Sequence, residues 1–252
     1  MCGLPTWPYA KFCAHRGAGK LAPENTLAAF RLGYEHGYRM AEFDVKLSAD
    51  GVAFLLHDDT LDRTTSAQGR ADAHTWRDLA LLDAGSWHSA AYAGEPLAAL
   101  ATVARWSLAQ DVAVNIEIKP TRGRERETGA AVALDAATLW AGARVAPLLS
   151  SFSEAALEAA RDAVPALPRA WLADRLPDDW RERVARTGCV ALDLEHTLLD
   201  RALVDKIHAA GLRVLGWTVN DPVMIERLFD LGADTVITDA IDIVAPALAS
   251  VA

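Results

Sequence analysis

Three observations predict that this chain is an α/β protein, specifically a (β/α)8 barrel. Short apolar, β-branched segments alternate with Ala- and Leu-rich segments, which is typical of βα units and a parallel sheet. Eight of the apolar segments can form one ring of strands, the number that closes such a barrel. The length of 252 residues is the usual size of one barrel domain. We therefore expect a single domain over residues 1–252.

The expected barrel strands are short and recur along most of the chain. They are Phe12–Arg16, Met40–Lys46, Val112–Lys119, Val145–Phe152, Ala170–Ala173, Val190–Glu195, Arg213–Val219 and Thr235–Thr238.

A ninth apolar run, Val52–His57, follows the second strand after Ser48-Ala49-Asp50-Gly51. Asp-Gly is a strong hairpin signal, and a parallel crossover needs about a dozen residues or more. We therefore expect an antiparallel strand outside the ring. This hairpin should bring His57 level with Glu42.

Two further segments have recognisable boundaries. A helix is expected after Pro23, Asn25 and Thr26, and Gly37 should end it. A stretch rich in Gly, Ser, Asp and Trp, residues 61–96, precedes a helical segment at Leu97–Ala109. It has too few apolar residues for a core of its own, which predicts an insertion over the top of the barrel.

Composition and charge restrict the class of protein. The net charge of −9 argues against a nucleic-acid-binding protein, which needs a basic surface. The cysteines Cys2, Cys13 and Cys189 include no C-x-x-C pair, which indicates a reducing compartment without disulfides. The N-terminus lacks the pattern of a signal peptide, and no apolar run approaches the roughly 20 residues of a membrane span. We expect a cytoplasmic protein without stable membrane association.

Candidate metal ligands gather where the predicted strands end. In such barrels, functional groups collect at the C-terminal ends of the strands. Glu42 and Asp44 are two residues apart and share one strand face, and Glu117 lies near the end of the next barrel strand. Oxygen ligands of this kind suit Mg²⁺ or Ca²⁺ better than zinc. The alternative is a buried ionic network in which these acids pair with Arg16 and Lys119.

Two histidines and two cations complete the candidate site. His15 and His57 lie at strand ends beside the acids, and histidine can donate or accept a proton near neutral pH. Arg16 and Lys119 are candidate phosphate contacts. Trp217 could pack on a small alcohol or be a core aromatic. His196, which follows the sixth barrel strand, is a further candidate for substrate binding.

An ordered set of motifs in this chain resembles the signature motifs of a known family, the glycerophosphodiester phosphodiesterases. The motifs cover almost the whole chain. They are HRG at His15–Gly17, PENT at Pro23–Thr26, EFDV at Glu42–Val45, HDDTLDRTT at His57–Thr65, DAGSW at Asp83–Trp87, NIEIKP at Asn115–Pro120, SSFS at Ser150–Ser153, WTVN at Trp217–Asn220 and TDAID at Thr238–Asp242. The chain is most similar to the bacterial cytosolic branch.

The resemblance implies a distorted barrel and a metal-dependent reaction. A glycerophosphodiester would be hydrolysed to sn-glycerol 3-phosphate and an alcohol. His15 and His57 would be general acid and base, without a division of the two roles. The resemblance also implies one divalent cation on the three acids and phosphate contacts from Arg16 and Lys119. Glu24, Asn25 and Asp58 would support these groups.

Two other functions are compatible with the same residues. A lysophospholipase D-type phosphodiesterase would need an apolar surface for an acyl chain, for which the insertion offers candidates: Trp76, Leu81, Leu82, Trp87 and Tyr92. A phosphate-ester-binding barrel without catalysis would be expected to have lost a histidine or an acidic ligand. All of these residues are present.

Overall fold

The structure is a computed structural model that describes residue 4 and residues 6–244. Eight parallel strands form a closed ring, because β1 pairs with both β9 and β2. The ring strands are β1 (Phe12–Ala14), β2 (Met40–Leu47), β4 (Ala113–Ile118), β5 (Leu148–Ser151), β6 (Arg169–Ala173), β7 (Ala191–Glu195), β8 (Arg213–Trp217) and β9 (Thr235–Thr238). The predicted (β/α)8 barrel is therefore confirmed, and Cys2 lies outside the described residues.

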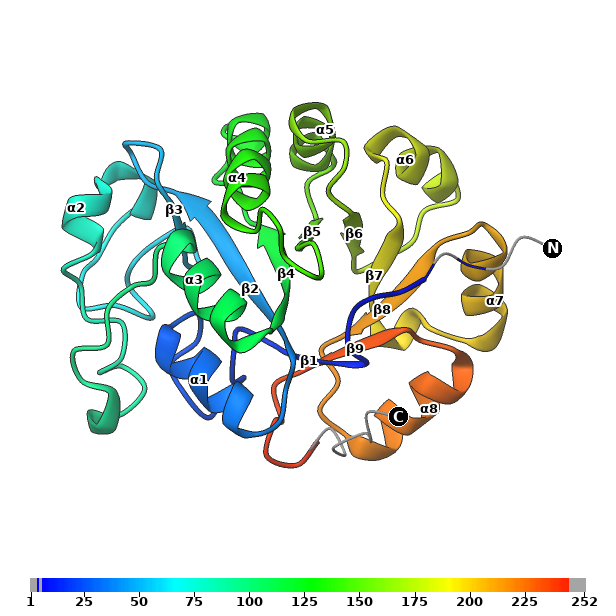
Figure 1. The fold of residues 1–252 in the computed structure, drawn as a ribbon, viewed down its shortest axis with the longest axis horizontal. Coiled ribbons are helices and arrows are strands. Elements are labelled where there is room, and N and C mark those ends of the chain that lie inside the picture. Colours follow the sequence, from blue (N-terminus) through cyan, green and yellow to red (C-terminus); the bar gives the residue numbers. More distant parts are fainter. Residues whose placement is uncertain (1–3, 5, 245–252) are drawn as a thin grey trace.

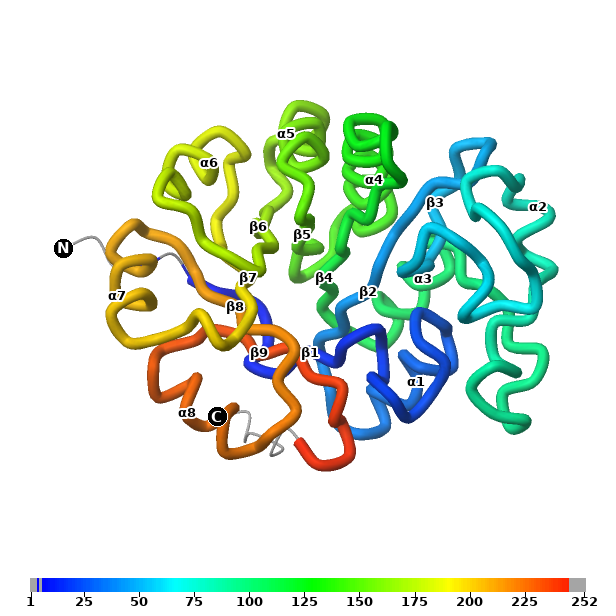
Figure 2. Tube along the Cα trace, turned by 180° about the vertical axis from the view of Figure 1, so that it is seen from behind, coloured from blue at the N-terminus to red at the C-terminus, as the bar shows by residue number. Residues whose placement is uncertain are grey.

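Helices surround this ring of strands (Figures 1 and 2). They are α1 (Leu27–Glu35), α3 (Leu100–Gln110), α4 (Glu125–Leu139), α5 (Glu154–Ala163), α6 (Trp180–Thr187), α7 (Arg201–Ala209) and α8 (Pro222–Leu231). A short 3-10 helix, η3 (His196–Leu198), precedes α7. Within the described part of the chain, no helix is both long and apolar enough to cross a bilayer.

The ninth strand, β3 (Ala53–Leu55), pairs antiparallel with β2 and lies outside the ring, as predicted. The expected position of His57 is wrong by about one residue. Val45 pairs with Leu55, and the Leu56 amide donates to the Asp44 carbonyl at 3.1 Å. Continued by two residues from the Val45–Leu55 pair, the register brings His57 level with Phe43 and not with Glu42.

Most of the segment 61–96 lies beyond β3, at the side of the barrel (Figure 1), although Arg63 near its start donates to Asp58 and Glu24. It contains η1 (Ala71–Ala73), α2 (Trp76–Leu79) and η2 (Ala90–Tyr92). Its apolar residues pack on the outer hairpin strand, in a small cluster with Phe54 and Leu56. Because that strand offers the segment an apolar surface to bury, the insertion follows the side of the barrel.

Alternation along the strands divides the barrel interior into layers. Successive strand residues point to opposite faces, so Phe43, Val45 and Ile116 pack toward the helices in one cluster. The residues at the N-terminal ends of the strands point inward and form an apolar plug. Its members on the ring strands include Cys13, Met40, Leu148, Ala170, Ala191, Leu215 and Ile237. This plug closes the lower end of the barrel, and polar residues occupy the interior above it.

Helix α3 begins without a side-chain cap. Its N-cap residue, Ala99, has extended backbone with φ −72° and ψ 147° and makes no side-chain hydrogen bond. In α1, by contrast, the Thr26 hydroxyl accepts from the Ala29 amide at 3.2 Å. We expect Ala99→Ser to stabilise the protein by about 1 kcal/mol, raising Tm by about 2–4 °C. Thermal denaturation measures this, with Thr26→Ala as the control of opposite sign. An unchanged or lower Tm for Ala99→Ser would contradict the assignment of Ala99 as the N-cap residue whose missing side-chain hydrogen bond can be supplied.

Candidate active site

The three predicted metal ligands converge at the upper end of the barrel interior. Strand register places Asp44 beside Glu117, and Glu42 lies one inward position below Asp44. All three side chains are buried. One carboxylate oxygen from each lies within 4.8 Å of the others, a grouping that could hold a metal ion.

Electrostatics shows that this cluster suits a cation. Burial and the neighbouring carboxylates raise the pKa of Glu42 to about 8 and that of Glu117 to about 7. Burial also disfavours ionised Asp44, but Lys119 and Arg16 hold the pKa of Asp44 well below its usual value. Glu42 Oε1 is buried and has no hydrogen-bond partner among the described residues. Three oxygen donors with an unsatisfied atom fit a hard divalent cation such as Mg²⁺ or Ca²⁺.

The two predicted phosphate contacts border the acids. Lys119 Nζ lies 3.0 Å from Glu117 Oε1 and 3.3 Å from Asp44 Oδ1. Arg16 Nε lies 3.4 Å from Asp44 Oδ2. These ion pairs are the ones expected if the acids formed a buried ionic network with Arg16 and Lys119 instead of a metal site. That network alone does not explain Glu42 Oε1, which lacks a hydrogen-bond partner in the described part of the chain.

The residues around Arg16 adopt an unusual backbone. Arg16 and Asn25 have φ of 50° and 62°, a left-handed conformation that costs energy outside glycine. The Asn25 amide group donates to Asp44 Oδ2 at 2.9 Å and accepts from the Asp44 amide at 3.1 Å. The Arg16 amide donates to Glu42 Oε2 at 3.1 Å. The strained loop thus fixes two of the three carboxylates.

His15 is held by a carboxylate from the other end of the chain. Its Nδ1 lies 2.6 Å from Asp239 Oδ1, and its Nε2 lies 3.7 Å from Glu42 Oε2. Burial disfavours the charged imidazole, but the hydrogen bond to Asp239 and the charge of Glu42 outweigh it and raise the pKa of His15. The adjacent loop leaves no room for a side chain at Gly19, because a Cβ there would lie 2.0 Å from the Asp239 carbonyl oxygen.

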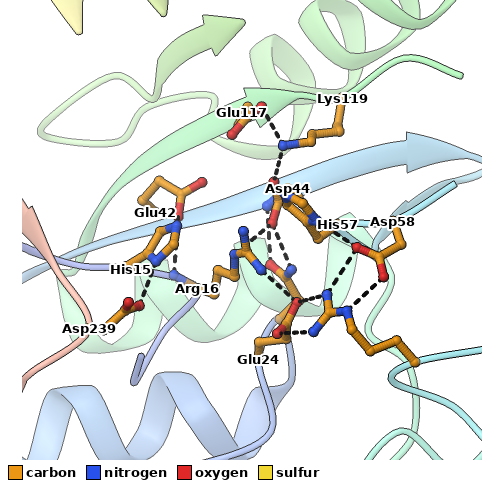
Figure 3. Close-up of polar contacts among 12 residues, drawn as sticks. His15, Arg16, Glu24, Glu42, Asp44, His57, Asp58, Glu117, Lys119 and Asp239 are labelled. Atoms are coloured by element: carbon orange, nitrogen blue, oxygen red, sulfur yellow. Dashed lines mark hydrogen bonds and ion pairs between the residues drawn. The ribbon is translucent and has the colours of Figure 1, made fainter. Parts of the chain in front are cut away.

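His57 is held by a second carboxylate, Asp58, whose Oδ1 lies 2.7 Å from His57 Nδ1. Arg63 donates to both Asp58 oxygens and to both oxygens of Glu24, and Glu24 also accepts from Arg16 at 2.8 Å. Burial lowers the pKa of His57, with Arg16 and Lys119 adding to the effect and Asp44 opposing it. The chain of contacts connects the His57 loop to Arg16 (Figure 3).

These groups surround a cavity of about 230 Å³. The predicted residues that line it are His15, Arg16, Glu42, His57, Glu117, Lys119 and Trp217. The Trp217 ring packs edge-on against Phe152, with centroids 5.5 Å apart. His196 does not line this cavity. Its Nδ1 instead lies 3.1 Å from Glu195 Oε1.

Several residues of the site were not among the predicted ones. Asp239 and Arg63 hold the two histidine loops, and the cavity also contains Asn115, Ser150 and Asp193. The signal for Asp239 was available: Ala14 pairs with Thr238, so the residues that follow them must be neighbours. Asn115 lies two positions before Glu117 and therefore points to the same face. Arg63 lies in a segment without periodicity, which offers no such signal.

Removing the charge of Asp239 tests its role in positioning His15. We expect Asp239→Asn to lower kcat by about 10- to 100-fold with little change in KM, because the imidazole loses its orienting carboxylate. The pH dependence of kcat should move as well, since Asp239 favours protonated His15. Steady-state kinetics across pH checks this. A uniform loss of activity at every pH, together with a lower Tm, would indicate a merely structural role.

Fold and site together define a (β/α)8 barrel whose upper end gathers acidic, basic and imidazole side chains around one cavity, as an enzyme active site does. The chain belongs to the glycerophosphoryl diester phosphodiesterase family, whose model matches residues 15–243.

Named relatives cover nearly the whole chain. A glycerophosphodiester phosphodiesterase of Caldanaerobacter subterraneus is 32% identical over 227 residues, covering 90% of this chain and 92% of the relative. An Oleispira antarctica phosphodiesterase, solved in complex with the product sn-glycerol 3-phosphate, is 34% identical with a TM-score of 0.86, covering 92% and 94% of the two chains. The glycerophosphodiester phosphodiesterase of Agrobacterium tumefaciens is 26% identical with a TM-score of 0.78, covering 94% and 99%.

Proposed function

We propose that this enzyme hydrolyses glycerophosphodiesters to sn-glycerol 3-phosphate and an alcohol, with a divalent cation and with His15 and His57 as the acid–base pair. The observation that carries the proposal is the arrangement of the two histidines. Each is held through Nδ1 by its own carboxylate, and the two flank the acidic cluster (Figure 3). The product bound to the Oleispira antarctica relative supports the choice of substrate.

Each group in the cavity has a role in this reaction. The cation would be held by Glu42, Asp44 and Glu117, and when bound it polarises phosphoryl oxygens. Arg16 and Lys119 bind the negatively charged phosphate oxygens and stabilise the charge that develops on them.

The histidines transfer the protons of the reaction. With Nδ1 directed to a carboxylate, each imidazole keeps Nε2 for the substrate. One Nε2 removes the proton of the attacking oxygen, and the other supplies a proton to the departing alkoxide. The attacking oxygen is either that of water, which gives sn-glycerol 3-phosphate directly, or the glycerol 2-hydroxyl, which gives a cyclic phosphate that water then opens to the same product. Asp239 and Asp58 keep the two rings in the required orientation.

The cavity favours a small substrate over a lysolipid. None of the insertion side chains Trp76, Leu81, Leu82, Trp87 and Tyr92 lines it. Trp76 packs against Phe54, and Tyr92 packs in the cluster under the β1–α1 loop. Leu81 is 83% exposed, but it lies in the insertion beyond β3. No acyl-chain surface therefore leads from the insertion into the site.

One experiment tests chemistry, metal and substrate together. The EDTA-treated enzyme is assayed with Mg²⁺, Ca²⁺ or Mn²⁺ restored, on glycerophosphocholine, glycerophosphoethanolamine, glycerophosphoinositol and lysophosphatidylcholine. We expect release of sn-glycerol 3-phosphate from the water-soluble diesters only after a cation is restored, and weaker turnover of the lysolipid. Ligand binding without turnover under every metal would contradict the proposal and favour a binding protein. Faster turnover of the lysolipid would favour the lysophospholipase D-type reaction.

A further inference from the structure

The floor of the active-site cavity is polar although it is fully enclosed. Asn115 on β4, Ser150 on β5 and Asp193 on β7 all line the cavity, and all three side chains are completely buried. They point inward because they alternate with residues that face the helices, such as Ile116 and Leu192. None of the three takes part in the proposed cation binding, phosphate binding or proton transfer.

These side chains make fewer hydrogen bonds than they could. Asn115 Nδ2 donates to Asp193 Oδ2 at 3.3 Å. Asp193 Oδ1, Asn115 Oδ1 and Ser150 Oγ are buried, and across residues 6–244 none of these atoms has a hydrogen-bond partner. Buried polar atoms are nearly always paired, because an unpaired one loses its hydration without replacement. All three atoms can accept a hydrogen bond, so the missing partner is a group that donates several.

The cavity is closed at the floor and open at the other end, and this difference indicates which part of the substrate lies at the floor. Beneath the floor lies the apolar plug, with Leu148, Ala191 and Ile237. At the other end the cavity opens beside Phe152, which is 45% exposed. A closed end suits the part that all glycerophosphodiesters share, whereas an open end tolerates alcohol groups of different size. The shared part is glycerol, whose two free hydroxyl groups are donors.

We propose that Asn115, Ser150 and Asp193 form the glycerol subsite, in which they accept hydrogen bonds from the two free hydroxyls of the sn-glycerol 3-phosphate moiety. This proposal rests on the proposed function. The floor would select against diesters whose corresponding group has no hydroxyls, since such a group leaves buried acceptors unpaired. Among the described residues, the grouping that could hold a metal comprises only Glu42, Asp44 and Glu117, so Asp193 is assigned to the alcohol.

The test compares two ligands that differ only in the hydroxyl groups. Calorimetry with Mg²⁺ measures the affinity of sn-glycerol 3-phosphate and of propyl phosphate, which keeps the phosphate and the three carbons. The wild-type enzyme should prefer sn-glycerol 3-phosphate by about tenfold or more, the effect of one good hydrogen bond. Ser150→Ala and Asp193→Asn should each reduce this preference by about three- to tenfold, with the affinity for propyl phosphate nearly unchanged.

Ser107→Ala is the matched control, because Ser107 is equally buried but lies on α3, where its hydroxyl donates to the Ala104 carbonyl. It should leave the preference intact. The subsite is wrong if the wild type shows no preference, if the floor variants keep it, or if both ligands lose affinity in parallel. Calorimetry measures binding without turnover. An enzyme that fails to cleave glycerophosphodiesters would therefore refute the proposed function alone, and the preference for sn-glycerol 3-phosphate over propyl phosphate would still test the subsite.

Discussion

Replacement of His15 or His57 by alanine is expected to lower kcat for glycerophosphocholine by roughly 10²–10⁴-fold, the usual contribution of one acid–base group. The reason is geometric: each ring is fixed by its own carboxylate, Asp239 or Asp58, beside the acidic cluster. The double variant should be little worse than the worse single variant, because groups that act in one reaction are not additive. Steady-state kinetics with Mg²⁺ restored measures all three.

The same variants can assign the two roles. Bis(p-nitrophenyl) phosphate releases a weakly basic phenolate that needs little protonation. The variant without the general acid should therefore recover much of its activity on this substrate, whereas the variant without the general base should not. His36→Ala serves as the control, since His36 lies at the C-terminus of α1 and does not line the cavity. If both histidine variants kept near-normal turnover and Tm, the acid–base assignment would be untenable.

Much of the fold follows from local signals in the sequence. The observed strands agree with the predicted ranges within three residues at each end, because period-two alternation and flanking turn residues are short-range properties. The Asp50-Gly51 turn also predicted the antiparallel hairpin, and Gly51 adopts a φ of 80° there. The disagreement at β1 has a clear cause: Arg16 turns to positive φ, so the ladder stops at Ala14.

The site was harder to predict because its contacts join distant segments. His15 and Asp239 are 224 positions apart, and only the closure of the ring brings them together. The floor residue Asp193 needed a different inference, namely that a polar residue on the inward face directly above an apolar plug must have a partner. The roles of Asp239, Asn115, Ser150 and Asp193 depend on register between strands, whereas that of Arg63 depends on the path of an irregular segment. The predicted metal ligands needed only the two-residue alternation within one strand, and His15, Arg16, His57 and Lys119 only the position of a strand end.

Replacement of Glu42 by glutamine should affect stability and cation binding in opposite directions. Without a cation, burial and the neighbouring carboxylates disfavour ionised Glu42 and raise its pKa to about 8, so folding near neutral pH must either bury this charge or protonate the group. A neutral amide of the same shape avoids that cost. We expect Glu42→Gln to raise the Tm of the EDTA-treated protein by about 2–4 °C, which corresponds to about 1 kcal/mol for a domain of this size.

The cation should reverse the order of the two proteins. A ligand present at 100 times its Kd stabilises the folded state by about 2.7 kcal/mol, so the wild type should gain several degrees when Mg²⁺ or Mn²⁺ is added. Glu42→Gln should gain little, because it lacks one of the three anionic donors, and its kcat should fall by roughly 10³-fold or more.

Asp193→Asn provides the control for this experiment, because it also replaces a buried carboxylate in the same cavity. It should keep the increase in Tm on addition of the cation, since Asp193 is not part of the acidic cluster. Differential scanning calorimetry with and without EDTA measures the increase in Tm for the wild type, Glu42→Gln and Asp193→Asn. Equal increases for wild type and Glu42→Gln would show that Glu42 holds no cation. A lost increase in Asp193→Asn would move the cation site toward the cavity floor, and would remove the basis for assigning that floor to glycerol.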